Sequence, residues 1–187
     1  MRARSLTIGA TLLGALVSPS LSAAAELKGV FHIDTGSYIR LREPKSGPFF
    51  KNPYSADTNK TYTLVTSGSQ GGLRTGVTQP APTPAFDAKG NSLSGAIIKP
   101  ANFTGILFGL ATTSAPSISV SDNKLTGQLD GLVAQWNKQT FKQGGTVTGT
   151  YNAKTHRYVL TWTSLVSGGP FNGFTGYWRL QGTFSAS

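Results

Sequence analysis

The last third of the chain alternates apolar and polar positions with a period of two. Thr146–Tyr151 and Arg157–Ser164 alternate in this way on either side of a short polar turn, which predicts a β-hairpin. The alternation returns in Tyr177–Phe184, after the glycine-rich loop Gly168–Gly176, and it places every second residue from Trp178 onward on one face. This region therefore predicts an antiparallel sheet.

Shorter segments of the same kind precede this region. The predicted strands are Val30–Ile33, Ser37–Arg42, Tyr62–Ser67, Ser94–Ile98, Thr104–Phe108, Ser117–Val120, Leu125–Leu129 and Leu132–Trp136. Asp122–Asn123 predicts a turn between two of them. Gly131–Phe141 fits a short helix about as well as a strand followed by a loop.

An apolar residue followed by Ser or Thr and then Gly recurs along the chain, as in Leu125–Gly127 and Val147–Gly149. Glycine inside a strand marks a bulge, a bend or the close approach of another backbone. Together with the short alternating segments, this predicts an all-β fold, either an antiparallel β-sandwich or an up-and-down β-barrel of roughly eight to ten strands.

The N-terminus has the composition of a secretory signal peptide. Two arginines precede the apolar run Leu6–Val17, and small residues follow it up to Ala25. We expect residues 1–25 to be the signal peptide and residues 26–187 to form a single β domain. The predicted location is secreted or periplasmic, in a bacterial export pathway, and no membrane span is expected because the apolar run is too short.

The chain is basic, with 17 Lys and Arg against 7 Asp and Glu and a formal net charge of +10. The basic residues are dispersed, which is typical of a solvated surface as well as of an anion-binding face. Export argues against a nucleic acid partner. With no cysteine in the chain, stability must come from burial and backbone pairing.

No catalytic motif is recognisable, so we expect no enzymatic activity and no cofactor. His32 lies two residues before Asp34, and on a strand the two would share a face. No third ligand lies nearby in the sequence, and we therefore predict no metal site. Ser121–Lys124 matches elements of serine acyl-transfer enzymes by letter but lacks their structural context.

Aromatic and basic residues gather in two loops that share a Gly-Pro-Phe core, Pro44–Tyr54 and Gly168–Gly176. Exposed aromatic rings beside cations bind sugar rings or anionic polymers. Alternatively, the phenylalanines fold back and plug the open end of the sheet. The predicted ligand-binding residues are Lys45, Phe49, Phe50, Lys51, Tyr54, Phe171, Asn172 and Phe174.

Two local resemblances to known proteins are present. Thr148–Tyr151, followed after a turn by Arg157–Thr161, resembles one hairpin of the avidin family, an eight-stranded up-and-down barrel that holds biotin. No biotin-contacting residue maps onto this chain. Trp162–Ser164, Gly168–Gly176 and Gly182–Phe184 resemble a group of uncharacterised small exported bacterial proteins, a resemblance that implies no activity.

The function predicted from these features is a secreted, non-catalytic binding module for a cell-envelope or extracellular ligand such as a polysaccharide. The alternative is a lipocalin- or avidin-like carrier with an internal apolar pocket for a small molecule. The oligomeric state is left open. An outer-membrane barrel and a hydrolase fit the sequence less well, because several strands are short and only two glutamates are present.

Overall fold

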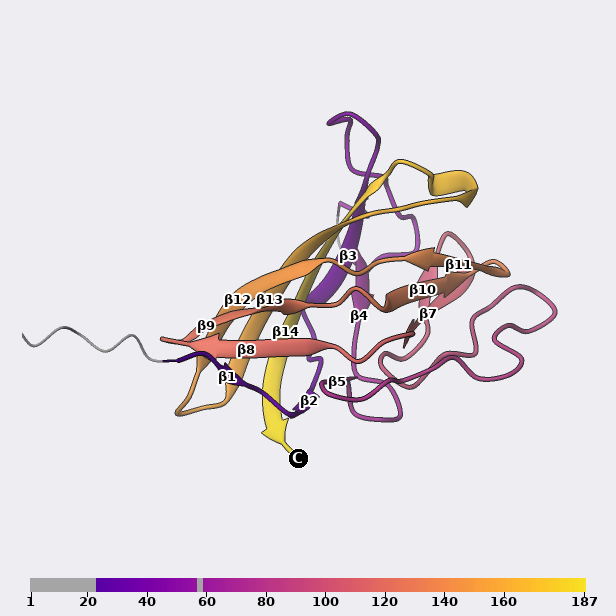
Figure 1. Cartoon of the computed structure of the whole chain (residues 1–187). Helices are drawn as coiled ribbons and strands as arrows, with labels where there is room; N and C mark the ends of the chain where they lie inside the picture. Colours follow the sequence, from indigo (N-terminus) through magenta and orange to yellow (C-terminus); the bar gives the residue numbers. More distant parts are fainter. Residues whose placement is uncertain (1–22, 57–58) are drawn as a thin grey trace, which may run out of the picture.

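The computed structural model describes residues 23–56 and 59–187, which form fourteen antiparallel strands in two sheets and a single turn of 3-10 helix (Figure 1). Most of the predicted signal peptide, residues 1–22, lies outside the described residues. Among the residues that the structure describes, no helix has the length and apolar character needed to span a bilayer.

The strands are divided unequally between the two sheets. The large sheet contains β1 (Ala25–Glu26), β2 (Gly29–Phe31), β3 (Ser37–Arg42), β4 (Thr63–Val65), β5 (Leu73–Arg74), β8 (Ser117–Ser121), β9 (Lys124–Gln128), β12 (Thr146–Asn152), β13 (Arg157–Leu165) and β14 (Thr175–Ala186). The small sheet contains β6 (Ala101–Phe103), β7 (Ile106–Thr112), β10 (Leu132–Trp136) and β11 (Gln139–Lys142). The 3-10 turn is Gly169–Phe171.

The large sheet is a curled half-barrel in which β1, β8, β9, β12, β13 and β14 follow one another. β14 then pairs with β3 along its first half and with β2 along its last residues. On their other edges, β3 pairs with β4 and β2 pairs with β5. The small sheet has the order β11-β10-β7-β6. Figure 1 shows it on the right, reached from β9 and β12 through short connections.

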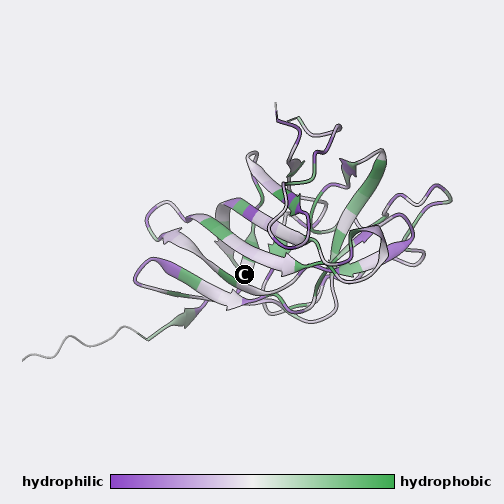
Figure 2. Cartoon of the chain, turned by 90° about the horizontal axis from the view of Figure 1, so that it is seen from above, coloured by the Kyte–Doolittle hydropathy of each residue, from purple (hydrophilic) through white to green (hydrophobic). Residues whose placement is uncertain are grey.

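β14 follows the alternation that its sequence predicts. Trp178, Leu180 and Phe184 are buried on the inner face, whereas Tyr177 and Arg179 are half-buried on the outer face. Figure 2 shows hydrophobic residues concentrated on the strands and hydrophilic residues gathered at several of the turns between them. The outer face of the curled sheet is therefore where polar side chains of the long strands are displayed.

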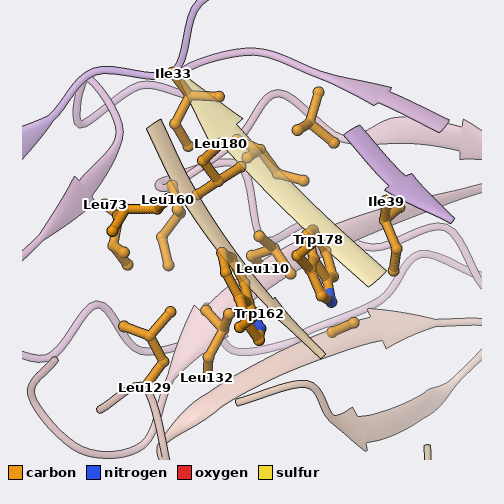
Figure 3. Packing of buried hydrophobic residues seen from close by; sticks show 14 of the residues in the cluster. Ile33, Ile39, Leu73, Leu110, Leu129, Leu132, Leu160, Trp162, Trp178 and Leu180 are labelled. Carbon is orange, nitrogen blue, oxygen red and sulfur yellow. The ribbon is translucent and has the colours of Figure 1, made fainter. Parts of the chain in front are cut away.

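Two tryptophans lie at the centre of the core. Trp162 of β13 and Trp178 of β14 are opposite each other in register, and their rings stack with centroids 5.4 Å apart and planes 2° apart (Figure 3). Buried Gln143 satisfies both indole N–H groups: Trp162 Nε1 donates to its backbone oxygen at 2.8 Å and Trp178 Nε1 to its Oε1 at 3.0 Å. Ser164 Oγ donates to the same Oε1 at 2.7 Å. One glutamine thus makes the burial of three polar groups possible.

The structure confirms the all-β antiparallel class, and β3 and β10 span the predicted residues. The strand predicted at Ser94–Ile98 is wrong, because this segment forms only an isolated bridge between Ile98 and Ser67. The strand predicted at Thr104–Phe108 is confirmed only from Ile106 onward, within β7, because Thr104 and Gly105 have φ angles of 51° and 93° and form the turn between β6 and β7.

The segment Gly131–Phe141, for which a short helix was one option, forms the hairpin of β10 and β11. Asn137 and Lys138, at the turn of this hairpin, have φ angles of 48° and 59°. Two successive residues with positive φ are typical of the tight turn that joins antiparallel strands. The turn that the sequence predicts at Asp122–Asn123 is confirmed, with φ angles of 49° and 62°.

Replacing Gln143 by Leu tests the role of this glutamine in the core. The substitution keeps the approximate side-chain volume but leaves the Trp178 and Ser164 donors without their acceptor. We expect the free energy of unfolding to fall by about 2–4 kcal/mol, measured by urea denaturation. Gln128→Leu is the matched control, because Gln128 is exposed and its replacement should change stability by no more than about 0.5 kcal/mol. Equal losses in the two variants would contradict this account.

Candidate ligand-binding face

Tyrosines and arginines alternate across the outer side of the β3–β14 pair. The antiparallel register places Tyr177 opposite Arg40 and Arg179 opposite Tyr38. Arg42 follows two residues after Arg40 and points to the same side of the sheet. Cross-strand neighbours on one face lie close enough for their side chains to interact, so the register gathers these residues into one surface.

The three tyrosines of this surface form a row. Tyr38 and Tyr62, which immediately precedes β4, are stacked with ring centroids 4.6 Å apart and planes 20° apart. Tyr177 lies on the other side of Tyr38, with centroids 6.1 Å apart and a tilt of 36°. Since all three rings are only half-buried, the row presents aromatic surface to solvent.

Arg40 is held between two rings. Its guanidinium carbon lies 3.7 Å from the centroid of Phe49 and 4.8 Å from that of Tyr62, and that of Arg42 lies 4.9 Å from the same phenylalanine. A β-bridge between Arg42 and Phe49 fixes the loop that carries Phe49. We call this set of residues the tyrosine–arginine face: Tyr38, Arg40, Arg42, Phe49, Tyr62, Tyr177 and Arg179.

The positive charge of this face is not balanced within the described part of the chain. The ion pairs there join Lys28 to Glu26 and Arg157 to Asp34, and neither includes an arginine of the face. The Nε of Arg40 is buried and makes no hydrogen bond to any described residue. A buried, unpaired donor is uncommon in folded proteins and calls for an explanation.

The Tyr38 phenol contributes no charge near neutral pH. Burial, followed by the neighbouring Tyr177 and Tyr62, raises the pKa of Tyr38 above its ordinary value. Arginine stays protonated at all physiological pH values. The charge of the face is therefore positive and constant across that range.

The two loops predicted to bind ligand do come together, but their phenylalanines mainly form a plug. Phe171 packs against Phe50 at 5.5 Å and Phe174 at 5.5 Å between ring centroids. It also contacts Phe103 at 5.5 Å and Trp136 at 5.4 Å. The alternative interpretation, in which phenylalanines close the end of the sheet, is thus the one that the structure supports for these three loop residues.

The plug covers a small apolar cavity of about 40 Å³, whose lining includes Leu41, Phe108, Trp136, Phe141 and Phe171. A cavity of this size has room for one or two water molecules. Pockets for small organic ligands usually measure several hundred Å³. The cavity therefore lends no support to a small-molecule carrier.

The other predicted site residues lie at the surface of the same two loops. Tyr54 is 54% exposed, and Lys45, Lys51 and Asn172 are exposed as well. The Oδ1 of Asn172 accepts a hydrogen bond from the backbone N–H of Gly168 at 2.8 Å, so this side chain stabilises its own loop. Of the predicted residues, Phe49 is the one that joins the tyrosine–arginine face.

His32 and Asp34 share a face, as expected, and lie at the edge of an open polar hollow of about 820 Å³. The ring nitrogens of His32 lie 2.9 Å from the oxygen of Gly71 and 2.9 Å from Ser185 Oγ. No group of three metal-ligating side chains occurs among the described residues. We call this feature the polar hollow; its lining includes His32, Asp34, Lys99, Arg157, Gln181 and Thr183.

Sequence reasoning missed most of the face, although a signal for it exists. Ser37–Arg42 and Tyr177–Gln181 both alternate, and their outward positions carry only tyrosine, arginine and glutamine. The inward positions of both segments form the core, and the outward positions form the face. Tyr62 gives no such signal, because it precedes its strand and reaches Tyr38 only through the pairing of β3 with β4.

Comparisons of the chain with known protein families, with curated proteins and with solved structures find no match.

The ionisation of Tyr38 tests the packing of the tyrosine row. Subtracting the alkaline absorbance titration of Tyr38→Phe from that of the wild type isolates this phenol. We expect a midpoint above about 10, the ordinary tyrosine value, and a return to that value in denaturant. Because the folded-state pKa is raised, the associated stability is present below pH ~10 and is lost as the pH rises through the folded value. An ordinary midpoint in the folded protein would contradict the packing.

Proposed function

We propose that this chain is an exported, non-catalytic binding module that holds a polysaccharide of the cell envelope or extracellular space on its tyrosine–arginine face. The observation that carries the proposal is the setting of Arg40. Its guanidinium is fixed between Phe49 and Tyr62, its Nε has no hydrogen-bond partner among the described residues, and no described carboxylate pairs with it.

The chemistry of the face suits a carbohydrate. Aromatic rings offer flat apolar surface on which the C–H face of a sugar packs, and tyrosine adds a hydroxyl at the ring edge. Arginine supplies several N–H donors in a planar fork that matches a carboxylate or sulfate group. Tyr177 and Arg40, directly opposite each other, combine these two kinds of contact at one point.

The face also supports binding without catalysis. Its members are tyrosines, arginines and one phenylalanine, and none of them is a carboxylate or histidine that would act as a general acid or base near neutral pH. Five of its seven side chains come from β3 and β14, which are hydrogen-bonded to each other, so most of the scaffold is rigid. A rigid array of this kind lowers the entropic cost of binding an extended ligand.

Substitutions of Arg40 provide the test. Arg40→Ala should weaken binding to an acidic envelope polysaccharide about tenfold or more, because a charge-assisted hydrogen bond is lost. Arg40→Lys should recover only part of the affinity, since lysine keeps the charge but lacks the planar fork. Affinity electrophoresis in polysaccharide-containing gels measures the effect, and Arg74→Ala, which changes an exposed arginine of β5, is the matched control.

The same variants separate binding from folding. Arg40→Ala also removes the contacts of the guanidinium with Phe49 and Tyr62, so it should lower the free energy of unfolding by about 0.5–2 kcal/mol while the domain stays folded at the assay temperature. Undiminished retention of Arg40→Ala, or an equal loss in Arg74→Ala, would refute the proposed site.

A further inference from the structure

The polar hollow lies on the same outer side of the sheet as the tyrosine–arginine face. Gln181 and Thr183 of β14 line it, and Arg157 of β13 is directly opposite Thr183 in register. Asp34 borders the hollow on the other edge of β14. Its backbone N–H donates a hydrogen bond to the backbone oxygen of Gln181 at 2.8 Å. At about 820 Å³ the hollow has the size of known ligand sites.

β14 connects the two features without interruption. Tyr177, Arg179, Gln181 and Thr183 occupy every second position on its outer side, and at ~3.3 Å per residue they span about 20 Å. Arg179 Nη1 donates a hydrogen bond to Gln181 Oε1, and Gln181 Nε2 donates to the oxygen of Thr35 at 2.8 Å. The side chains of the face and of the hollow thus belong to one hydrogen-bonded row.

Positive charge lies at both ends of this row. Arg40, Arg42 and Arg179 are at one end, and Lys99 and Arg157 line the hollow at the other. Asp34 is the one carboxylate of the hollow's lining, and its Oδ2 lies 3.4 Å from Arg157 Nη1. A ligand that touches both ends therefore meets five cations and one carboxylate that is already paired.

We infer that the face and the hollow are two subsites of one track along β14, which holds an extended acidic polysaccharide bearing carboxylate groups. The inference rests on the proposed function and specifies its ligand. The arginines of the face bind the sugar carboxylates, while the hydroxyls of Thr66 and Thr183 in the hollow bind sugar hydroxyls.

The hollow favours an acidic glycan over a nucleic acid because hydroxyl groups line it. The Thr66 and Thr183 hydroxyls pair with sugar hydroxyls, which the phosphodiester backbone of DNA lacks. The linear arrangement along one strand also matches a polymer chain more closely than it matches a flat lipid surface.

The first experiment varies the ligand and keeps the full chain unchanged. Titration calorimetry compares a uronic acid disaccharide, a uronic acid octasaccharide, a neutral octasaccharide and a single-stranded oligonucleotide of similar length. We expect the acidic octasaccharide to bind at least about tenfold more tightly than the disaccharide and the neutral chain, with affinity falling as salt rises. Tighter binding of the oligonucleotide, or equal binding of the neutral octasaccharide, would overturn the inference.

The second experiment varies the hollow. The double variant Lys99→Ala, Arg157→Ala should weaken octasaccharide binding roughly tenfold and leave disaccharide binding to the face unchanged. Asp34→Asn should act in the opposite direction and strengthen octasaccharide binding a few-fold, because it frees Arg157 and removes a negative charge. A variant that merely disturbed folding would not produce opposite effects from the two members of one ion pair, and thermal unfolding midpoints check this directly.

The outcomes separate this inference from the proposed function. If the hollow variants bind the octasaccharide as the wild type does while Arg40→Ala loses binding, the continuous track is wrong and the face remains a binding site. If Arg40→Ala binds every ligand normally, the proposed function fails, whatever the hollow does. If none of the four ligands binds the wild type, both proposals fail.

Discussion

The register of β14 is the constraint on which the rest of the structure depends. This strand of 12 residues is hydrogen-bonded along both edges, to β13 on one side and to β3 and β2 on the other. Side chains alternate with a period of two, so a slip of one residue would exchange the two faces. Trp178 would then be exposed and Arg179 buried, and the core and the candidate binding face would be lost together.

Pairing both β2 and β3 with the same edge of β14 requires the N-terminal segment to bend between them. The bend is the turn Asp34–Ser37, in which the Ser37 N–H donates to the Asp34 oxygen at 3.2 Å. Before the bend, the backbone at His32 passes so close to Gly182 that a β-carbon there would lie 1.8 Å from the His32 oxygen. Glycine is needed at this position because any side chain would push the two strands apart.

The consequence of this bend is functional as well as structural. Because the alternation resumes on the same face after Ser37, the side chains of His32 and Asp34 before the bend share the outer side with those of Tyr38 and Arg40 after it. The polar hollow and the tyrosine–arginine face are thereby brought into one line along β14. A straight strand of the same residues would leave no recess in which a hollow could form.

The sequence was sufficient where a local pattern decides the structure and insufficient where distant strands pair. The alternation in β3, β13 and β14 predicted those strands and their buried faces, because a period of two is a property of each segment alone. Predicting the face would also require knowing which distant strands pair. Arg40 meets Tyr177, and Tyr38 meets Arg179, only through pairing between opposite ends of the chain, and no local pattern encodes a register of that kind. The turn at Thr104–Gly105 was missed for a different reason, because the glycine of an apolar-Thr-Gly segment marks a bulge within a strand as readily as a turn between two strands.

The same long-range pairing decides which aromatic side chains are buried in the core and which face solvent. Phe50, Phe171 and Phe174 have neighbours on converging loops, so their most favourable position is against Phe103 and Trp136, where apolar surface is removed from water. Tyr38, Tyr62 and Tyr177 lie on the outer side of the sheet, where their rings pack beside one another and stay only half-buried. Burying Phe50, Phe171 and Phe174 while displaying these tyrosines therefore allows one chain both to close its core and to keep an aromatic outer surface.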